Sequence, residues 1–179
     1  IRAPKYFKMF DFNLAAKNYE KLDRNVLVQD AKIIRAHRKN MEGFEFTAGN
    51  ELDKLYADID SGFFQSRYDC EGDALVLQLI PYTLIFDNRG NIYCYTRSSD
   101  IKEYGDNRLF GKVSIGLGGH VTQEDAPDFI KNCLMREVFG EEADILGDYS
   151  EPKMVGTLFS SEKPVDRVHF GLIYTIHTD

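Results

Sequence analysis

Several residue types are scarce in this chain, and each shortage excludes a class of protein. The 179 residues include no Trp and only three Cys. Cys70, Cys94 and Cys133 are far apart and odd in number, which excludes a disulfide framework and a zinc-binding pattern. Reduced thiols fit the cytoplasm, where we expect this protein. We also expect Cys94, in a β-prone run, and Cys133 to be small buried hydrophobic residues.

Long apolar runs and basic residues are also missing. No apolar run approaches the length of a membrane span and no signal-peptide pattern is present, so we expect no membrane contact. The net charge is −7, from 22 Lys and Arg against 29 Asp and Glu. Binders of nucleic-acid polymers carry a basic patch, so this balance disfavours that class. A small phosphorylated ligand stays open, because a few local cations can hold one.

The length fits one compact domain, but the pattern changes near residue 70. Residues 1–70 are charged and carry no chemical motif. They contain one strand candidate at 26–28 and one helix candidate that Asn50 could cap, with apolar residues at helical spacing: Leu52, Leu55, Tyr56 and Ile59. We interpret residues 1–70 as an α+β extension packed on a main domain of residues 71–179. An independent small domain is the alternative.

Residues 71–179 show strands first, then a helix, then strands again. A hairpin is expected from 75–86 and 91–97 around the turn 87–90, with Pro81 marking an irregular or edge stretch. Beyond a loop at 98–110, the pattern predicts a strand at 112–117, a helix from Asp125 to Gly140, and strands at 153–160 and 168–178. This order predicts an α/β fold, a mixed sheet flanked by helices. Since the chain stops straight after its last strand, we expect that a C-terminal helix is missing.

Two glutamates fall on the apolar face of the expected helix. At about 100° per residue, one stripe collects Ile130, Cys133, Leu134 and Val138, and Glu137 and Glu141 lie inside it, one turn apart. A carboxylate pointed into apolar surface is costly unless a cation compensates it, and two carboxylates together repel. A divalent metal ion answers both costs, because hard cations prefer carboxylate oxygens. The alternative is a solvated helix end whose facing is misjudged by a residue or two.

A glycine-rich turn precedes this helix, and together they resemble the box of the Nudix (MutT-like) hydrolases. The family pattern is Gly, five residues, Glu, seven residues, then Arg-Glu-apolar-x-Glu-Glu-x-Gly-apolar. Here Gly118 and Gly119 look like the glycine pair, Arg136-Glu137-Val138 matches the core, and Glu141 matches the second glutamate of the pair. Segments outside the box look like a Nudix subgroup labelled predicted phosphoesterases: 80–82, 95–97, 111–116 and 167–171.

The resemblance implies a Nudix-type α/β/α sandwich and a hydrolase that needs Mg²⁺ or Mn²⁺. It would cleave the diphosphate bridge of a nucleoside diphosphate derivative with metal-activated water. The resemblance assigns the metal ligands to the Gly118 carbonyl, Glu137 and Glu141. Catalysis would rest on Glu137, Glu141 and Arg136, which holds the carboxylates. Substrate contacts fall to Arg97 as a phosphate clamp, Gly119 and His120, and the resemblance also allows a homodimer.

The chain departs from the family pattern at several points. Gly140 replaces the first glutamate of the pair, Ala143 replaces the closing glycine, and the stretch before Arg136 is longer. Glu124 keeps the five-residue spacing from Gly118 and Asp128 keeps the seven-residue spacing to Arg136, and only one of them can anchor the helix.

Two further questions stay open at this point. The general base could be Glu162, Asp166 or a residue beyond Asp179. The alternative function, favoured by Gly140, is a degenerate Nudix scaffold that binds nucleotide or regulates without hydrolysis.

Overall fold

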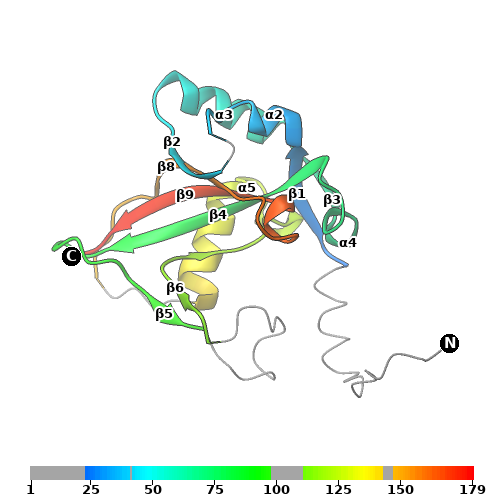
Figure 1. Cartoon of the computed structure of the whole chain (residues 1–179). Helices are drawn as coiled ribbons and strands as arrows, with labels where there is room; N and C mark the ends of the chain where they lie inside the picture. Colours follow the sequence, from blue (N-terminus) through cyan, green and yellow to red (C-terminus); the bar gives the residue numbers. More distant parts are fainter. Residues whose placement is uncertain (1–22, 41, 98–110, 143–146) are drawn as a thin grey trace, which may run out of the picture.

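The computed structural model describes residues 23–40, 42–97, 111–142 and 147–179, with only the backbone for Glu141 and Glu142. Its centre is a seven-stranded mixed sheet in the order β2-β8-β9-β4-β1-β3, with β7 paired to β4 (Figure 1). These strands are β1 (Asn25–Asp30), β2 (Gly43–Phe46), β3 (Phe63–Ser66), β4 (Val76–Phe86), β7 (Leu117–Gly118), β8 (Lys153–Phe159) and β9 (His169–His177). The expected α/β class with a mixed sheet is therefore confirmed.

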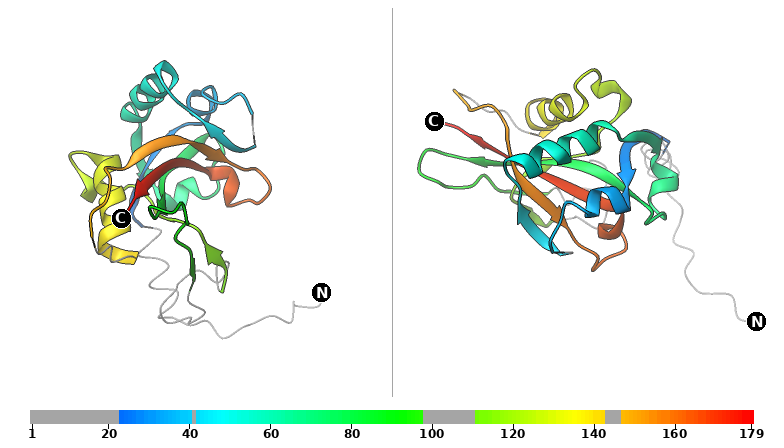
Figure 2. Two further views of the ribbon diagram at one scale, coloured as in Figure 1. Left: turned by 90° about the vertical axis from the view of Figure 1, so that its left-hand side faces the viewer. Right: turned by 90° about the horizontal axis from the view of Figure 1, so that it is seen from above.

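Helices cover this sheet, and a small ribbon lies apart from it. The ribbon pairs β5 (Tyr95–Thr96) with β6 (Val113–Ser114). The helical elements are α2 (Ala31–Arg35), α3 (Asn50–Asp60), α4 (Arg67–Cys70), η2 (Gln123–Asp125), α5 (Phe129–Met135), η3 (Arg136–Glu142) and η4 (Asp166–Val168). In Figure 1, α2 and α3 lie above β4 and β9 and the ribbon lies below them, and Figure 2 shows the same arrangement from two further sides. No helix in the described part of the chain is long and apolar enough to cross a membrane.

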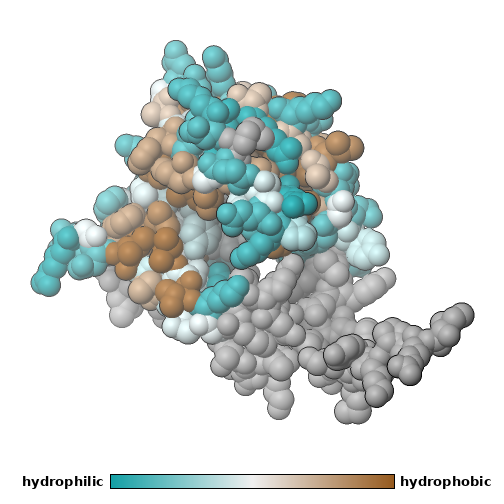
Figure 3. Space-filling view, viewed as in Figure 1, coloured by the Kyte–Doolittle hydropathy of each residue, from teal (hydrophilic) through white to brown (hydrophobic). Residues whose placement is uncertain are grey.

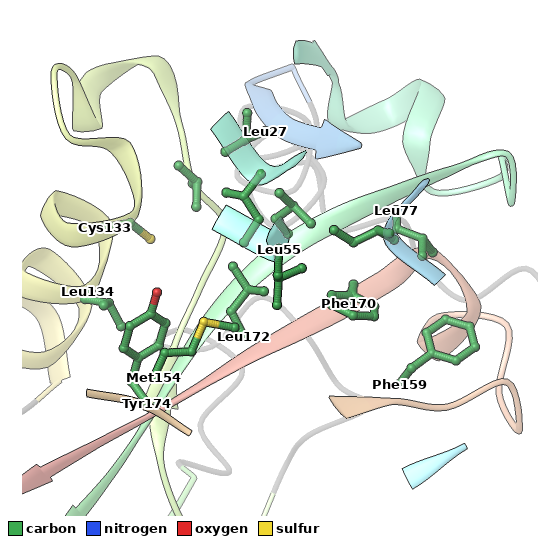
Figure 4. Packing of buried hydrophobic residues seen from close by; sticks show 14 of the residues in the cluster. Leu27, Leu55, Leu77, Cys133, Leu134, Met154, Phe159, Phe170, Leu172 and Tyr174 are labelled. Carbon is green, nitrogen blue, oxygen red and sulfur yellow. The ribbon is translucent and has the colours of Figure 1, made fainter. Parts of the chain in front are cut away.

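β4 and β9 form the parallel pair at the centre of the sheet, from Gln78 opposite His169 to Phe86 opposite His177. Because side chains alternate along a strand, this register puts alternate residues of both strands on one face. That face holds the main core, to which α2, α3 and α5 contribute (Figure 4). Its members on the central strands are Leu77, Leu79, Phe170, Leu172 and Tyr174. Burying each large apolar side chain contributes about 1.5–3 kcal/mol.

Strands from the first 70 residues belong to the same sheet as the rest of the chain. β1 pairs with β4 and β2 pairs with β8, both antiparallel. Helix α3 follows its predicted spacing, with Leu55 and Ile59 buried, while its outward side is hydrophilic in Figure 3. The expected cap is wrong, because the cap position is Gly49 at φ 60° and Asn50 is the first helical residue. Residues 1–22 and the expected loop at 98–110 lie outside the described residues.

Pro81 lies where β4 changes partners on one edge. β1 pairs with β4 up to Gln78, whereas β7 pairs with it from Tyr82 onward. The prediction of an irregular stretch at Pro81 is confirmed, since a residue without a backbone N–H suits a gap in pairing. The predicted hairpin is only partly formed. Phe86 and Ile92 make one bridge after the turn, and β5 then leaves to pair with β6.

The predicted strand at 112–117 is divided into β6 and β7, but the last two predicted strands are confirmed as β8 and β9. The prediction for Cys94 is wrong, because its side chain is exposed, whereas Cys133 is buried as expected. Cys94 lies between the bridge at Ile92 and β5, outside both ladders, so no neighbouring strand covers it. Cys70 and Cys94 are free thiols, and Sγ of Cys133 lies 3.8 Å from the Gly119 carbonyl oxygen.

A thiol reagent at about pH 8 should label Cys94 well before Cys70 or Cys133. Cys70 is fully buried, and burial, with Asp69 nearby, raises the pKa of its thiol to about 11, so that it stays protonated. Mass spectrometry of the native protein measures the order of labelling, and the protein in urea, where all three should react, is the control. Labelling of Cys70 as fast as Cys94 would contradict this packing.

Candidate functional site

The glycine turn is held against two strands of the sheet. β7 pairs with β4 through Gly118 opposite Tyr82, and the backbone N–H of Leu27 in β1 donates to the Val121 carbonyl at 2.9 Å. A Cβ on Gly118 would lie 2.2 Å from the Pro81 carbonyl oxygen. At Gly118, β7 therefore lies so close to β4 that only a residue without a side chain fits.

The missing side chain of Gly118 lets two strands approach each other, whereas the missing side chain of Gly119 makes room for a carboxylate. A Cβ on Gly119 would lie 2.2 Å from Oε1 of Glu137 and 2.8 Å from its Oε2. The Glu137 side chain therefore occupies the place of the missing methyl group, and Glu137 is only 8% exposed. The inward orientation that the helical spacing predicted for this carboxylate is confirmed.

The helix after the turn begins later than predicted. Thr122 and Asp125 form a capping box around the 3₁₀ turn η2, with the Thr122 backbone N–H donating to Asp125 Oδ2 at 2.8 Å. Asp125 is thus engaged with its own turn, and the side chain of Asp128 caps α5 by accepting from the Lys131 N–H. The predicted start at Asp125 is wrong for that reason. The predicted apolar stripe is present, because Cys133, Leu134 and Val138 are buried and Ile130 is partly buried.

Arg136 joins the two acidic residues of the site. Its Nε donates to Asp125 Oδ1 at 2.9 Å and its Nη2 to Asp125 Oδ2 at 3.1 Å, a two-pronged contact. Its Nη1 donates to Glu137 Oε1 at 2.6 Å, and Nη2 also donates to the His120 carbonyl at 3.1 Å. One guanidinium therefore fixes η2, the glycine turn and the helical carboxylate relative to one another.

The charges in this network do not cancel. The side chains of Asp125 and Glu137 are 3% and 10% exposed, and the Arg136 side chain that they share is 30% exposed. The hydrogen bonds to Asp125, and then the charge of Glu137, raise the pKa of Arg136 above its usual value, so its charge is permanent. Among the described residues of this network, two carboxylates face one cation, which leaves an excess of one negative charge in a largely buried place. Such an excess favours a further cation.

The helix changes its hydrogen bonding at Arg136. Residues Arg136–Glu142 form a π-helix, in which bonds join residues five apart. An α-helix brings positions i+3 and i+4 over residue i, whereas this wider turn brings i+4 and i+5 over it. Counted from Glu137, those two positions are Glu141 and Glu142. The predicted α-helical spacing is therefore wrong, although Glu141 keeps its place one turn from Glu137 and Glu142 joins it there.

Two histidines meet beside the glycine turn. The Nε2 atoms of His120 and His169 are 3.1 Å apart, and Nδ1 of His169 is 2.6 Å from the Val165 carbonyl. A carbonyl only accepts, so Nδ1 of His169 carries the proton, and in neutral rings His120 donates to His169 through Nε2. Desolvation, helped by the charge of Arg67, lowers the pKa of His120 well below its usual value. His120 is therefore neutral, although part of its surface reaches solvent.

The other predicted site residues lie at various places around this network. Arg97 follows β5, where its Nη2 donates to Ser114 Oγ at 3.4 Å, and that hydroxyl in turn donates to the Gly116 carbonyl at 3.0 Å. Arg97 is thus connected to the glycine turn through Ser114. Glu162 is exposed in the turn after β8, and Asp166 is half-buried at the start of η4. The side chain of Glu141 and all of Ala143 lie outside the described residues.

Asp125 is the site residue that the sequence interpretation missed. Glu124 is exposed and Asp128 caps α5, so neither of the two weighed alternatives holds Arg136. A signal was present, because five residues separate Gly119 from Asp125 just as five separate Gly118 from Glu124. Counting from the second glycine of the pair gives the acidic residue that the structure places against Arg136.

The donors gathered here fit a hard divalent cation such as Mg²⁺ or Mn²⁺. Among the described residues they are oxygens: the Glu137 carboxylate and the backbone carbonyls of the glycine turn beside it. The space that Gly119 leaves brings the turn and the Glu137 carboxylate together. No group of three metal-ligating side chains occurs among the described residues, which exclude the carboxylates of Glu141 and Glu142.

Comparisons with known proteins agree with this geometry. The chain is similar in structure to Tm1382, a protein provisionally assigned to the Nudix hydrolases, with a TM-score of 0.68 and 26% identity over 87% of this chain and 76% of that one. The chain has a Nudix-like fold. It is also 24% identical to the protein YmaB of Bacillus subtilis (strain 168) over 159 residues, 86% of this chain and 75% of YmaB. No family model matches the chain.

Asp125→Asn should lower the free energy of unfolding by about 2–3 kcal/mol, because the buried charged pair with Arg136 is lost and the amide fits the donors around it poorly. The matched control is Glu124→Gln at the exposed neighbouring position, which should change stability by less than about 0.5 kcal/mol. Urea unfolding followed by circular dichroism measures both values. Equal effects of the two substitutions would show that Asp125 does not anchor the site.

Proposed function

We propose that the chain is a metal-dependent hydrolase that cleaves the diphosphate bridge of a nucleoside diphosphate derivative. The observation that carries this proposal is the Glu137 carboxylate, held by Arg136 and set into the space that Gly119 leaves. The Nudix-like fold, shared with Tm1382, supports it. Glu137 and Glu141, with the Gly118 carbonyl, are the proposed metal ligands, and the geometry of the π-helix adds Glu142 to them. The free cysteines suit the cytoplasm as its compartment.

In this proposal, some residues hold the metal ion and others orient the substrate. When bound, Mg²⁺ or Mn²⁺ neutralises the diphosphate and supplies a water of lowered pKa. Arg136 holds the Glu137 carboxylate in place beside the glycine turn. Gly119 and the neutral His120 offer the substrate a backbone surface and an uncharged imidazole. Arg97, close to the turn through Ser114, provides positive charge for a phosphate.

Gly140 can be aligned with the family pattern in two ways, and the π-helix favours the second. Read as a substitution, it removes one carboxylate of the Glu-Glu pair. Read as an insertion, it moves the pair by one residue to Glu141 and Glu142, and in a π-helix both positions follow Glu137 by one turn. A Cβ on Gly140 would meet nothing within 4 Å, so contacts with the described residues do not require a glycine at this position. The insertion favours an active hydrolase over a degenerate scaffold.

The alternative is a nucleotide-binding or regulatory module without hydrolysis. In this alternative, Gly140 replaces a glutamate that metal binding requires. Such a module would bind nucleotide without divalent metal and leave it intact. Hydrolysis and metal dependence therefore separate the two proposals.

Turnover of a panel of nucleoside diphosphate derivatives with Mg²⁺ or Mn²⁺ tests the hydrolase. Glu137→Gln should lower turnover by about a hundredfold or more, which is ~3 kcal/mol of barrier, because the amide holds a cation poorly. Glu124→Gln, an exposed glutamate in the same segment, should leave turnover unchanged. Release of product should be followed by chromatography, with circular dichroism to confirm folding. Equal turnover of the Glu137→Gln variant and the wild type would refute the role of Glu137.

Deleting Gly140 tests the insertion. Without Gly140, the two glutamates follow Glu137 by three and four residues, as in the family pattern. An α-helix then places both of them one turn from Glu137. The deletion variant should therefore keep turnover within about tenfold of wild type, or ~1.4 kcal/mol. The matched variant deletes Phe139 instead, which also shortens the segment by one residue but removes an aromatic side chain packed against the core cluster of Val138. Loss of turnover on deleting Gly140, with folding intact, would contradict the insertion.

A further inference from the structure

A pocket lies beside the box helix, on the flank of α5 that the glycine turn does not touch. Its volume is about 700 Å³, and it lies between α3 and the first turns of α5, with β9 as part of its wall. This volume is within the range of small-molecule sites. Residues Pro127–Lys131 and Leu134 contribute from the α5 side, whereas none of Gly119, Arg136 and Glu137 lines it. The pocket is therefore separate from the proposed hydrolase site.

Aromatic rings form much of its wall. Phe64 and Phe129 contact each other edge to face, with ring centroids 5.0 Å apart. Tyr56 of α3 and Tyr174 of β9 meet through their hydroxyl oxygens at 3.3 Å. Figure 4 shows Tyr174 rising beside Leu134 of α5. Burial, and then the hydrogen bond to Tyr56, raises the pKa of Tyr174, so its phenol stays neutral.

The charged residues at the pocket are mostly acidic. Asp60, Asp128 and Glu151 line it with a single cation, Lys131, whose Nζ is 3.8 Å from Glu151 Oε2. Three carboxylates against one ammonium leave an excess of two negative charges at the wall. This excess repels a diphosphate, and it attracts a cation. Aromatic faces attract cations as well.

We propose that this pocket is a second ligand site, which binds a small organic cation: an ammonium group on an apolar body. The aromatic wall contacts the apolar body and the ammonium group of the ligand. The carboxylates at the rim balance the positive charge of the ammonium group. The proposal rests on the pocket alone, and it stands or falls independently of hydrolysis at the box.

The test titrates the metal-free protein with 2-phenylethylammonium, with neutral 2-phenylethanol and with the anion phenylacetate. Calorimetry measures affinity, and backbone amide shifts in nuclear magnetic resonance spectra locate the ligand. The cation should bind most tightly and the anion most weakly, with shifts at Phe64, Phe129 and Ile130. An equal or reversed order of affinities, or shifts confined to other residues, would overturn the proposal.

Two charge-neutralising double variants complete the test. Asp60→Asn with Glu151→Gln should weaken binding of the cation about three- to tenfold, since an ion pair with an exposed carboxylate contributes only modestly to affinity. Binding of the neutral alcohol should not change. Asp53→Asn with Glu51→Gln, which removes two exposed charges from α3 outside the pocket, is the control. If the control weakened cation binding as much, general surface charge would explain the affinity and the site would be disproved.

Discussion

The guanidinium of Arg136 is the part on which the arrangement of the site depends. It binds Asp125 in the turn before the helix, Glu137 on the helix and the His120 carbonyl in the glycine turn. A buried carboxylate in contact with a glycine is stable only while this cation holds it, and the same contact keeps the carboxylate aimed at the turn.

The helix that carries this carboxylate has two different flanks. One flank faces the glycine turn and belongs to the proposed metal site, whereas the other faces α3 and lines an aromatic, acidic pocket. The first 70 residues supply α3 as well as three strands of the sheet. They therefore form one wall of the pocket, which gives this segment of the chain a role beyond packing.

The sequence predicted those features that depend on regular spacing. The apolar stripe on α5, the inward Glu137, the helix with Leu55 and Ile59, and the strands β4, β8 and β9 all follow from period and composition. Asp125 was missed because three acidic residues compete near the glycine pair, and the count from either glycine is equally plausible on paper. The exposed Cys94 was missed because a β-prone run does not show where pairing with a neighbour stops.

Other features cannot be read from spacing at all. A π-helix differs from an α-helix in which backbone groups pair, and Gly140 alone does not reveal that change. The pocket joins Tyr56 to Tyr174, more than a hundred residues apart, through the packing of α3 against β9. Both depend on tertiary contacts, and both bear on the proposals: the first on the spacing of Glu141 and Glu142 from Glu137, and the second on the pocket.

The central claim is that the carboxylate held by Arg136 binds a divalent ion at the glycine turn. A crystal soaked in Mn²⁺ measures this directly, because anomalous scattering locates the ion without reference to activity. The account predicts a peak at about 2.0–2.3 Å from a Glu137 carboxylate oxygen, beside Gly118 and Gly119. A crystal with saturating Mn²⁺ and no peak within reach of Glu137 would contradict it.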